Sequence, residues 1–180
     1  TIVNAIPVAG LTSSDGDDII CDGDQVIFTG TGGTTYEFFL NDVSLGAASA
    51  ITTYTTDTLN NNDAVKVAAF SNGCSDTTAA IIITVNPLPT ITFVSDDADS
   101  TICDGDVVEF TATGGTMYEF LVNNTIAQAF SADNTYDTDT LNNGDMISVV
   151  VDDGNCTDTS EVIPFIVDPA ITATIATSDA

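Results

Sequence analysis

The chain reads CDGDQVIFTGTGGTTYEFFL over residues 21–40 and, 82 positions later, CDGDVVEFTATGGTMYEFLV over residues 103–122. In both stretches apolar and polar residues alternate with a period of two, which is typical of half-buried β-strands. The glycine pair in the middle of each stretch is typical of a turn. The two stretches therefore predict two copies of one strand-turn-strand unit.

The whole chain repeats with this offset of 82 residues, and the alignment needs no gap. Roughly 45 of the 98 overlapped positions are identical, and Cys74 aligns with Cys156. Such self-similarity indicates tandem copies of one structural unit. The residues Asn86-Pro87-Leu88-Pro89 join the two copies, and their prolines predict a short, semi-rigid linker.

The phase of the repeat divides the chain into four expected parts. They are the end of a preceding repeat or a linker over residues 1–8, repeat 1 over 9–89, repeat 2 over 90–170, and a last segment over 171–180. The last segment aligns with the opening strand of a repeat. We expect it to be either the first strand of a following repeat or a strand donated to a neighbouring sheet.

Each repeat holds four groups of alternating apolar residues that we expect to face a core. In repeat 1 they are Val26 and Phe28, then Tyr36, Phe38 and Leu40, then Val65, Val67 and Ala69, then Ile81, Ile83 and Val85. In repeat 2 they are Val108 and Phe110, then Tyr118, Phe120 and Val122, then Ile147, Val149 and Val151, then Ile163, Phe165 and Val167. The spacing predicts an all-β chain of tandem immunoglobulin-like antiparallel β-sandwiches, with about seven strands each.

The charge balance excludes several classes of function. There are 27 acidic residues against a single base, Lys66, and the formal net charge is -26 at pH 7. This charge repels nucleic-acid phosphates and anionic lipid surfaces, and no apolar stretch approaches the roughly 18 residues of a membrane helix. We therefore expect no nucleic-acid partner and no membrane insertion. The chain has no histidine, which excludes imidazole catalysis and imidazole metal ligation.

The four cysteines allow three pairings. Because 53 residues separate Cys21 from Cys74 and also Cys103 from Cys156, pairing inside each repeat is the only one of the three schemes that treats both copies identically. We predict these two disulfides, and an even, repeated cysteine count suits an oxidising compartment. Buried free thiols and a zinc site made of four cysteines are the alternatives, although the chain lacks the CxxC spacing common in zinc sites.

Acidic residues gather ahead of the second strand expected in each repeat and form the candidate metal site. They are Asp15, Asp17, Asp18, Asp22 and Asp24 in repeat 1 and Asp96, Asp97, Asp99, Asp104 and Asp106 in repeat 2. Carboxylates on turns suit Ca²⁺, although the spacing is not that of an EF-hand. One prediction is therefore calcium as the one cofactor, with the ligands Asp15, Asp17, Asp22, Asp24, Asp97, Asp99, Asp104 and Asp106. The other is a solvated face of turn-forming aspartates.

Paired carboxylates can also hydrolyse glycosides. Here the same aspartates recur in both repeats, as structural turns do, and no cleft-forming insertion interrupts the period of 82 residues. We predict no catalytic residues and no enzymatic activity.

Several motifs together resemble a known type of repeat. They are the opening C-D-G-D, then V-x-F-T-x-T-G-G-T, Y-E-F and T-x-x-L-x-N-x-D, a second cysteine, and the closing V-N-P-L-P. The pattern is similar to the immunoglobulin-like or PKD-like repeats of large secreted surface proteins of Bacteroidota, including gliding-motility adhesins and extracellular filament proteins. The resemblance covers both repeats almost end to end.

This resemblance implies export, a bacterial cell-surface or secreted-filament location, and a disulfide of the type that links the two sheets of a sandwich. It implies a structural or adhesive module whose partners are neighbouring repeats, copies of itself, or surface glycans. A carbohydrate-binding or spacer module of a secreted hydrolase is the alternative.

The resemblance also implies O-linked glycans on an Asp-Ser or Asp-Thr motif. The matching hydroxyl residues are Thr58, Thr77, Ser100, Thr140 and Thr159. Because the chain is rich in Thr and Asp, ordinary turn residues are the alternative for these positions.

Overall fold

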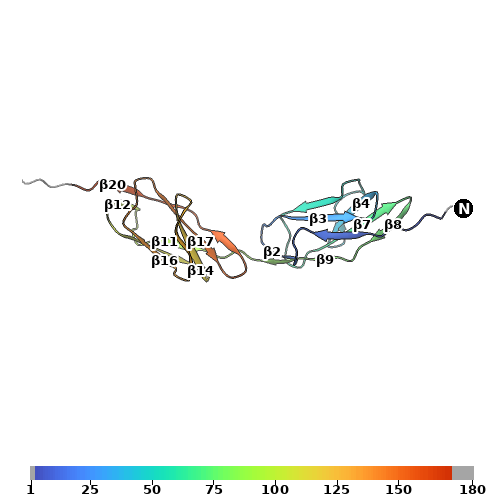
Figure 1. Cartoon of the computed structure of the whole chain (residues 1–180), viewed down its shortest axis with the longest axis horizontal. Coiled ribbons are helices and arrows are strands. Elements are labelled where there is room, and N and C mark those ends of the chain that lie inside the picture. The colour runs from blue at the N-terminus through green and yellow to red at the C-terminus, as the bar shows by residue number, and fades with distance from the viewer. Residues whose placement is uncertain (1–2, 172–180) are drawn as a thin grey trace, which may run out of the picture. The chain divides into compact units, whose positions relative to one another are not determined.

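The computed structural model describes residues 3–171, and all of them lie in β-strands or in the loops between strands (Figure 1). The chain divides into two compact units, Thr1–Pro87 and Leu88–Ala180, which we call module 1 and module 2. The predicted boundary, after residue 89, lies two residues further along. Residues 3–171 contain no helix long and apolar enough to span a membrane. The strand expected over residues 171–180 lies outside the described residues, except for Ile171.

Module 1 consists of two main sheets and one two-stranded ladder. The first sheet has the order β1 (Gly10–Ser13), β3 (Val26–Thr31), β6 (Thr53–Thr56). The second has the order β5 (Val43–Ser44), β4 (Thr35–Leu40), β7 (Ala64–Ser71), β8 (Cys74–Thr77), and β9 (Ile81–Ile82) also pairs with β7. The ladder joins β2 (Ile19–Cys21) to β10 (Thr84–Asn86).

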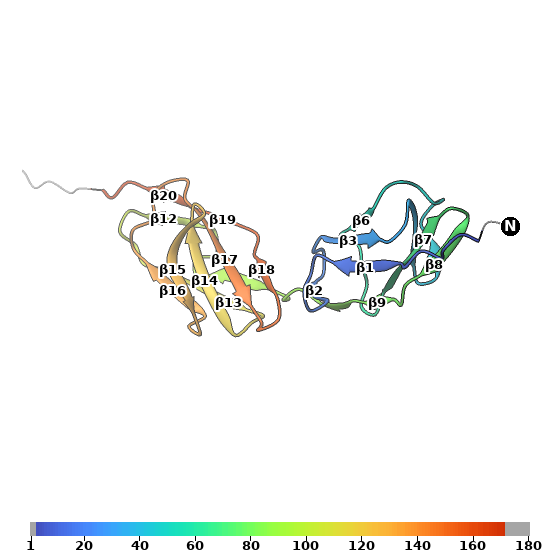
Figure 2. The same cartoon turned by 45° about the vertical axis from the view of Figure 1, so that its right-hand side comes forward.

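Module 2 repeats this arrangement strand for strand (Figure 2). Its first sheet has the order β11 (Thr92–Ser95), β13 (Val108–Thr113), β16 (Thr135–Thr138). Its second has the order β15 (Thr125–Ser131), β14 (Met117–Val122), β17 (Met146–Asp152), β18 (Thr157–Thr159), with β19 (Ile163–Pro164) on β17. Its ladder joins β12 (Thr101–Cys103) to β20 (Ile166–Asp168).

The predicted all-β, immunoglobulin-like sandwich is confirmed, with one difference in strand direction. If β1 and β2 count as one interrupted strand and β8, β9 and β10 as another, each module has the seven strands expected. The ladders β2–β10 and β12–β20 are parallel, however, whereas the prediction was antiparallel throughout. Alternation predicts which side chains face the core, but it does not predict the direction of the neighbouring strand.

The two sheets of each module enclose one core. In module 1, Val26 and Phe28 of β3 pack with Tyr36 and Phe38 of β4, and Phe28 is completely buried. In register, Tyr36 lies opposite Ala69 and Phe38 opposite Val67. All four predicted groups are buried or half-buried in both modules, which confirms the predicted core.

Candidate functional site

The first cysteine of each module lies at the end of the parallel ladder. In register, Cys21 of β2 is the partner of Asn86 of β10, and Cys103 of β12 is the partner of Asp168 of β20. Both cysteines therefore stand beside the last strand residue before the proline that closes the module, Pro87 or Pro169.

A tight turn fixes each of these cysteines. The backbone N–H of Asp24 donates to the carbonyl of Cys21 (3.0 Å), and the Asp24 carboxylate accepts the N–H of Cys21 in return (3.0 Å). Gly23 has a φ of 88°, a left-handed conformation that glycine adopts without strain. Cys103 and Asp106 make the same two bonds, at 3.0 and 3.1 Å. The C-D-G-D motif is thus the turn that presents the cysteine.

Beside this turn each module has a small hollow, which we call the end hollow. In module 1 it is about 200 Å³ in volume and is lined by Asp22, Leu59, Asn60, Asn61, Val85 and Pro87. In module 2 it is about 220 Å³ and is lined by Asp104, Leu141, Asn142, Asn143, Val167 and Pro169. All six pairs of equivalent residues are identical.

The second cysteine of each module lies in the hairpin that follows β7 in module 1 and β17 in module 2. Cys74 is the register partner of Ser71, and its Sγ is 3.8 Å from the carbonyl oxygen of Asn4. The Asn4 side chain donates to the carbonyl of Asn72 (2.6 Å). In module 2, the Asp153 carboxylate accepts the N–H of Cys156 (2.9 Å), and this bond is the main cause of the lowered pKa of Asp153.

The two cysteines of one module lie at opposite ends of it. Cys21 lies near the first residue of β7, because β10 is tied there by the bond from the Val85 N–H to Asn61 (3.1 Å). Cys74 lies beyond the last residue of β7, and this strand has eight residues. At about 3.3 Å per residue β7 is roughly 23 Å long. Figure 2 shows β2 and β8 at opposite ends of module 1.

The predicted disulfides Cys21–Cys74 and Cys103–Cys156 are therefore wrong. Cys21 and Cys156 are disulfide-bonded, whereas Cys74 and Cys103 are free thiols. A disulfide requires Cα atoms within about 4.4–6.8 Å of each other, a range that the length of β7 exceeds. The disulfide between the two sheets of a module, which the resemblance implied, is absent for the same reason.

Six of the eight predicted calcium ligands accept backbone hydrogen bonds in turns, namely Asp15, Asp17, Asp24, Asp97, Asp99 and Asp106. Asp15 accepts the N–H of Ile19 (3.1 Å), as does Asp17 (3.2 Å), and Asp97 and Asp99 each accept the N–H of Thr101 (3.1 Å).

In module 2, Asp96, Asp97 and Asp106 line one open hollow of about 260 Å³. Yet no three acidic or cysteine side chains within residues 3–171 are grouped so as to hold a metal ion. Calcium at these positions stays a prediction from the sequence.

The predicted glycosylation positions differ in exposure. Thr58, Thr77, Thr140 and Thr159 are exposed, whereas Ser100 is half-buried and has a φ of 56°. The hydroxyls of Thr58 and Thr140 each lie within hydrogen-bond distance of a threonine two residues earlier, at 3.1 and 3.0 Å. Glycosylation at these positions stays a prediction.

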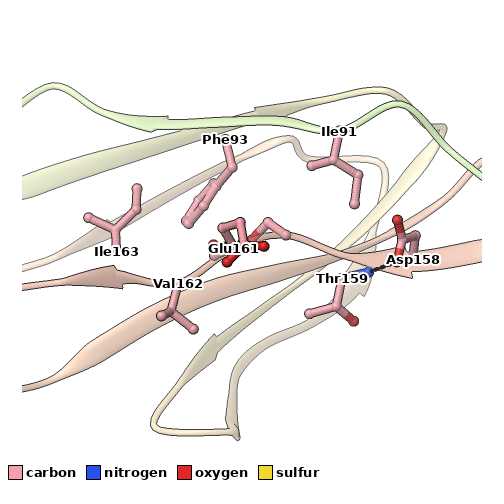
Figure 3. A pocket seen from close by; sticks show the side chains of 8 residues that line it. Ile91, Phe93, Asp158, Thr159, Glu161, Val162 and Ile163 are labelled. Atoms are coloured by element: carbon pink, nitrogen blue, oxygen red, sulfur yellow. Dashed lines mark hydrogen bonds between the residues drawn. The ribbon is translucent and has the colours of Figure 1, made fainter.

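The largest hollow described lies in module 2, between the open edges of its two sheets (Figure 3). It has a volume of about 400 Å³, and Ile91 and Phe93 on one side face the segment from Asp158 to Ile163 on the other. The Asp158 carboxylate accepts the N–H of Thr159 (2.8 Å). Only three of its eight lining residues have identical equivalents in module 1. We call it the side pocket.

Residues 7–87 match the sequence family described as Ig-like domain, CHU_C associated. This span is module 1 without its first six residues. Since module 2 has the same sheets in the same order, the chain consists of two immunoglobulin-like modules. A search of curated proteins found no match.

Several solved structures resemble the Ig-like pair at low sequence identity. The fibronectin(III)-like modules of Clostridium thermocellum CbhA are 16% identical, with a TM-score of 0.48 over 96% of this chain and 100% of theirs. Three N-terminal domains of the bacteriophage RB49 Highly Immunogenic Outer Capsid protein are 12% identical, with a TM-score of 0.43 over 89% of this chain and 59% of theirs. Bacteroides uniformis beta-glucuronidase 3 is 12% identical, with a TM-score of 0.37 over 89% of this chain and 25% of that enzyme.

Proposed function

We propose that this chain is part of an extracellular structural array, a stalk, adhesin or filament at a bacterial surface. In this array the immunoglobulin-like modules set the spacing and their ends make the connections. The proposal rests on which residues are identical in the two modules. All six residues of the end hollow are the same in both modules, whereas most residues of the side pocket differ. A repeated end is what each unit of an array needs.

The charge of the chain supports the same function. Lys66 is the one base, and its ammonium lies beside the Asp42 carboxylate and 5.7 Å from the centre of the Phe39 ring. With a net charge of -26, copies of the chain repel one another unless a specific contact joins them. Such a surface suits a soluble, exposed polymer whose contacts are confined to defined ends.

Electron microscopy of the native producing cells, labelled with an antibody against the two modules, tests the proposal. We expect label on extracellular strands or fibres. Label confined to the cell interior would contradict it.

The alternative, a carbohydrate-binding or spacer module of a secreted hydrolase, has its own test. Affinity electrophoresis of the two-module chain in gels containing soluble polysaccharides should show no retardation if the array proposal is correct. Strong retardation by one polysaccharide, lost when Phe93 in the side pocket is replaced by Ala, would favour the sugar-binding alternative.

A further inference from the structure

The residues that line the side pocket distinguish module 2 from module 1. Five of its eight lining residues differ between the modules, since only three are identical. Four of the differences enlarge an apolar side chain or introduce an acidic one in module 2. They are Ile91 in place of Ala9, Phe93 in place of Leu11, Glu161 in place of Ala79 and Val162 in place of Ala80. Module 2 therefore has more apolar surface and one more carboxylate at this edge.

The pocket lies where each sheet of module 2 has a free edge. Within residues 3–171, β11 pairs only with β13 and β18 pairs only with β17. In module 1 a bond joins the equivalent edges, since the Asp76 carboxylate accepts the N–H of Ala9 (3.0 Å). In module 2 the equivalent aspartate, Asp158, accepts the N–H of its neighbour Thr159 instead (2.8 Å). A hollow of about 400 Å³ lies between the two edges that this bond leaves apart.

The apolar wall of the pocket is held in place by the core. The Phe93 ring stacks on the ring of Phe110 at a centroid distance of 5.8 Å and lies 6.2 Å from the ring of Phe120. Figure 3 shows Ile91 and Phe93 pointing toward the segment that bears Glu161. Because this wall is already ordered, a ligand would not have to immobilise it, and the entropic cost of binding is lower.

The opposite wall is fixed by two hydrogen bonds to β17. The Ser160 N–H donates to the carbonyl of Val149 (2.9 Å), and the Ser160 hydroxyl accepts the N–H of Val149 (3.1 Å). Glu161 is the next residue and is exposed. Its backbone is therefore anchored while its side chain remains accessible to a partner.

The charges of the pocket indicate the chemistry of that partner. Asp158 and Glu161 both line the pocket, and residues 88–180 contain no lysine or arginine. Lys66, the one base of the chain, lies beside Asp42 in module 1. The complementary charge must therefore come from another molecule. A lysine or arginine side chain fits, because its methylene groups pack on apolar surface while its charged end reaches carboxylates.

The strand β11 indicates how such a side chain would be presented. The outer N–H and C=O groups of an edge strand can pair with an added strand from a partner. In β11 the side chain of Phe93 is half-buried, whereas Thr92 and Val94 are exposed. An added strand would likewise direct every second side chain toward the pocket, at intervals of about 7 Å. Basic and apolar residues can then alternate along one side of that strand.

We propose that the side pocket of module 2 is the docking site for an extended, basic segment of a partner protein. The segment pairs with β11 and directs lysine or arginine side chains toward Asp158 and Glu161. This site adds recognition of a partner to the proposed array function. The array function depends on the ends of the modules, so either proposal can fail without the other.

Binding of a synthetic peptide to the full chain tests this inference. The labelled peptide consists of Thr-Lys-Thr-Val repeats, in which lysine and valine alternate on one side of a strand. Fluorescence anisotropy is measured at about 0.15 M salt, where distant charges are screened. We expect the peptide to bind about tenfold more tightly than a peptide of the same composition with its lysines and valines adjacent. Equal binding of the two peptides would overturn the inference.

Two double variants of the chain locate the binding. Asp158→Asn/Glu161→Gln removes both carboxylates of the pocket, and the new amide at position 158 can still accept the N–H of Thr159. This variant should bind the alternating peptide about tenfold more weakly. The control, Asp137→Asn/Asp139→Asn, removes the same charge from exposed positions in and just after β16, the opposite edge strand of the first sheet. It should change binding by less than about twofold. Equal weakening in both variants would contradict a specific site.

Nuclear magnetic resonance distinguishes a strand from a small cation. On addition of the alternating peptide, we expect the amide signals of β11 and of residues 158–163 to shift. Shifts confined to other residues would overturn the inference. The amine n-butylamine at the same concentration has the charge but cannot pair with β11, and it should leave these signals unchanged. Shifts of equal size with the amine would identify the occupant as a small cation and contradict the docking of a strand.

Discussion

A single carboxylate holds the turn before β7 in module 1 and the turn before β17 in module 2. The Asp63 carboxylate accepts the side-chain N–H of Asn41 (2.7 Å) and the backbone N–H of Asn60 (2.8 Å). Asp145 makes the equivalent bonds to Asn123 and Asn142, at 2.7 and 2.8 Å. These bonds, chiefly those from the backbone N–H groups, lower the pKa of both carboxyl groups below the ordinary value of 3.8.

Because the folded-state pKa of Asp63 is lowered, its stabilisation is fully present above pH 3.8. It is lost as the pH falls through the folded-state pKa. Asp63→Asn should reduce the free energy of unfolding by about 1–2 kcal/mol near neutral pH. The difference from the wild type should vanish in strong acid, where Asp63 is protonated in both states. Urea unfolding at several pH values measures this, with the exposed Asp57→Asn as the control. A difference that persists in strong acid would contradict the assignment.

Gly32 lies in the turn between β3 and β4, where the backbone of this turn passes close to the backbone of Val8. Its φ is 91°, and an added Cβ would overlap the carbonyl oxygen of Val8. Gly32→Ala should therefore reduce the free energy of unfolding by about 3 kcal/mol or more, measured by denaturant unfolding. Gly16 has nothing within 4 Å of an added Cβ. Gly16→Ala should change stability by less than about 0.5 kcal/mol, and equal effects of the two changes would refute the reason given.

At the scale of the element, a tyrosine hydroxyl closes the turn that leads from β3 of the first sheet to β4 of the second. The Tyr36 hydroxyl donates to the carbonyl of Gly33 (2.7 Å) and accepts the N–H of Gly33 (3.1 Å). Tyr36→Phe removes both bonds and should cost about 1–2 kcal/mol. Tyr54→Phe keeps the ring that stacks on Phe28 at a centroid distance of 6.0 Å, and it should cost less. Thermal unfolding of both variants checks the order, and a larger loss for Tyr54→Phe would contradict it.

Strands in which apolar and polar residues alternate could be predicted from the sequence. The direction of the neighbouring strand in the sheet could not always be predicted. The alternation around Phe28 and Phe38 predicted which side chains are buried, because burial follows the period of a strand. The direction of β2 against β10 leaves no mark on that period, so the parallel ladder was missed.

The cysteine pairing was missed for a related reason. The repeat favours pairing inside each module, but the alignment of the two copies contains no information on the distance between the cysteines. The deciding fact is a length, since the eight residues of β7 separate the two cysteines of module 1. The end hollow was also missed, although the identity of its residues at an offset of 82 is visible in the sequence.

At the scale of the whole molecule, the large net negative charge lowers the stability of the folded state. With 27 acidic residues and one base, the folded modules carry a self-repulsion that dissolved salt screens. Raising sodium chloride from about 0.02 M to about 0.5 M should raise the melting temperature by a few degrees, of the order expected for about 1 kcal/mol. Calorimetry measures this shift. A melting temperature that falls or does not change would contradict a net destabilising repulsion.

The two modules share all six residues of their end hollows, and we propose that the ends of the modules, and not their faces, carry the array function. Mapping the disulfides by mass spectrometry, after proteolysis of unreduced protein, tests this claim most directly. We predict that no linked pair of peptides joins Cys21 to Cys74 or Cys103 to Cys156, because the two cysteines of one module lie at opposite ends of it. Linked peptides containing Cys21 with Cys74 and Cys103 with Cys156 would contradict it.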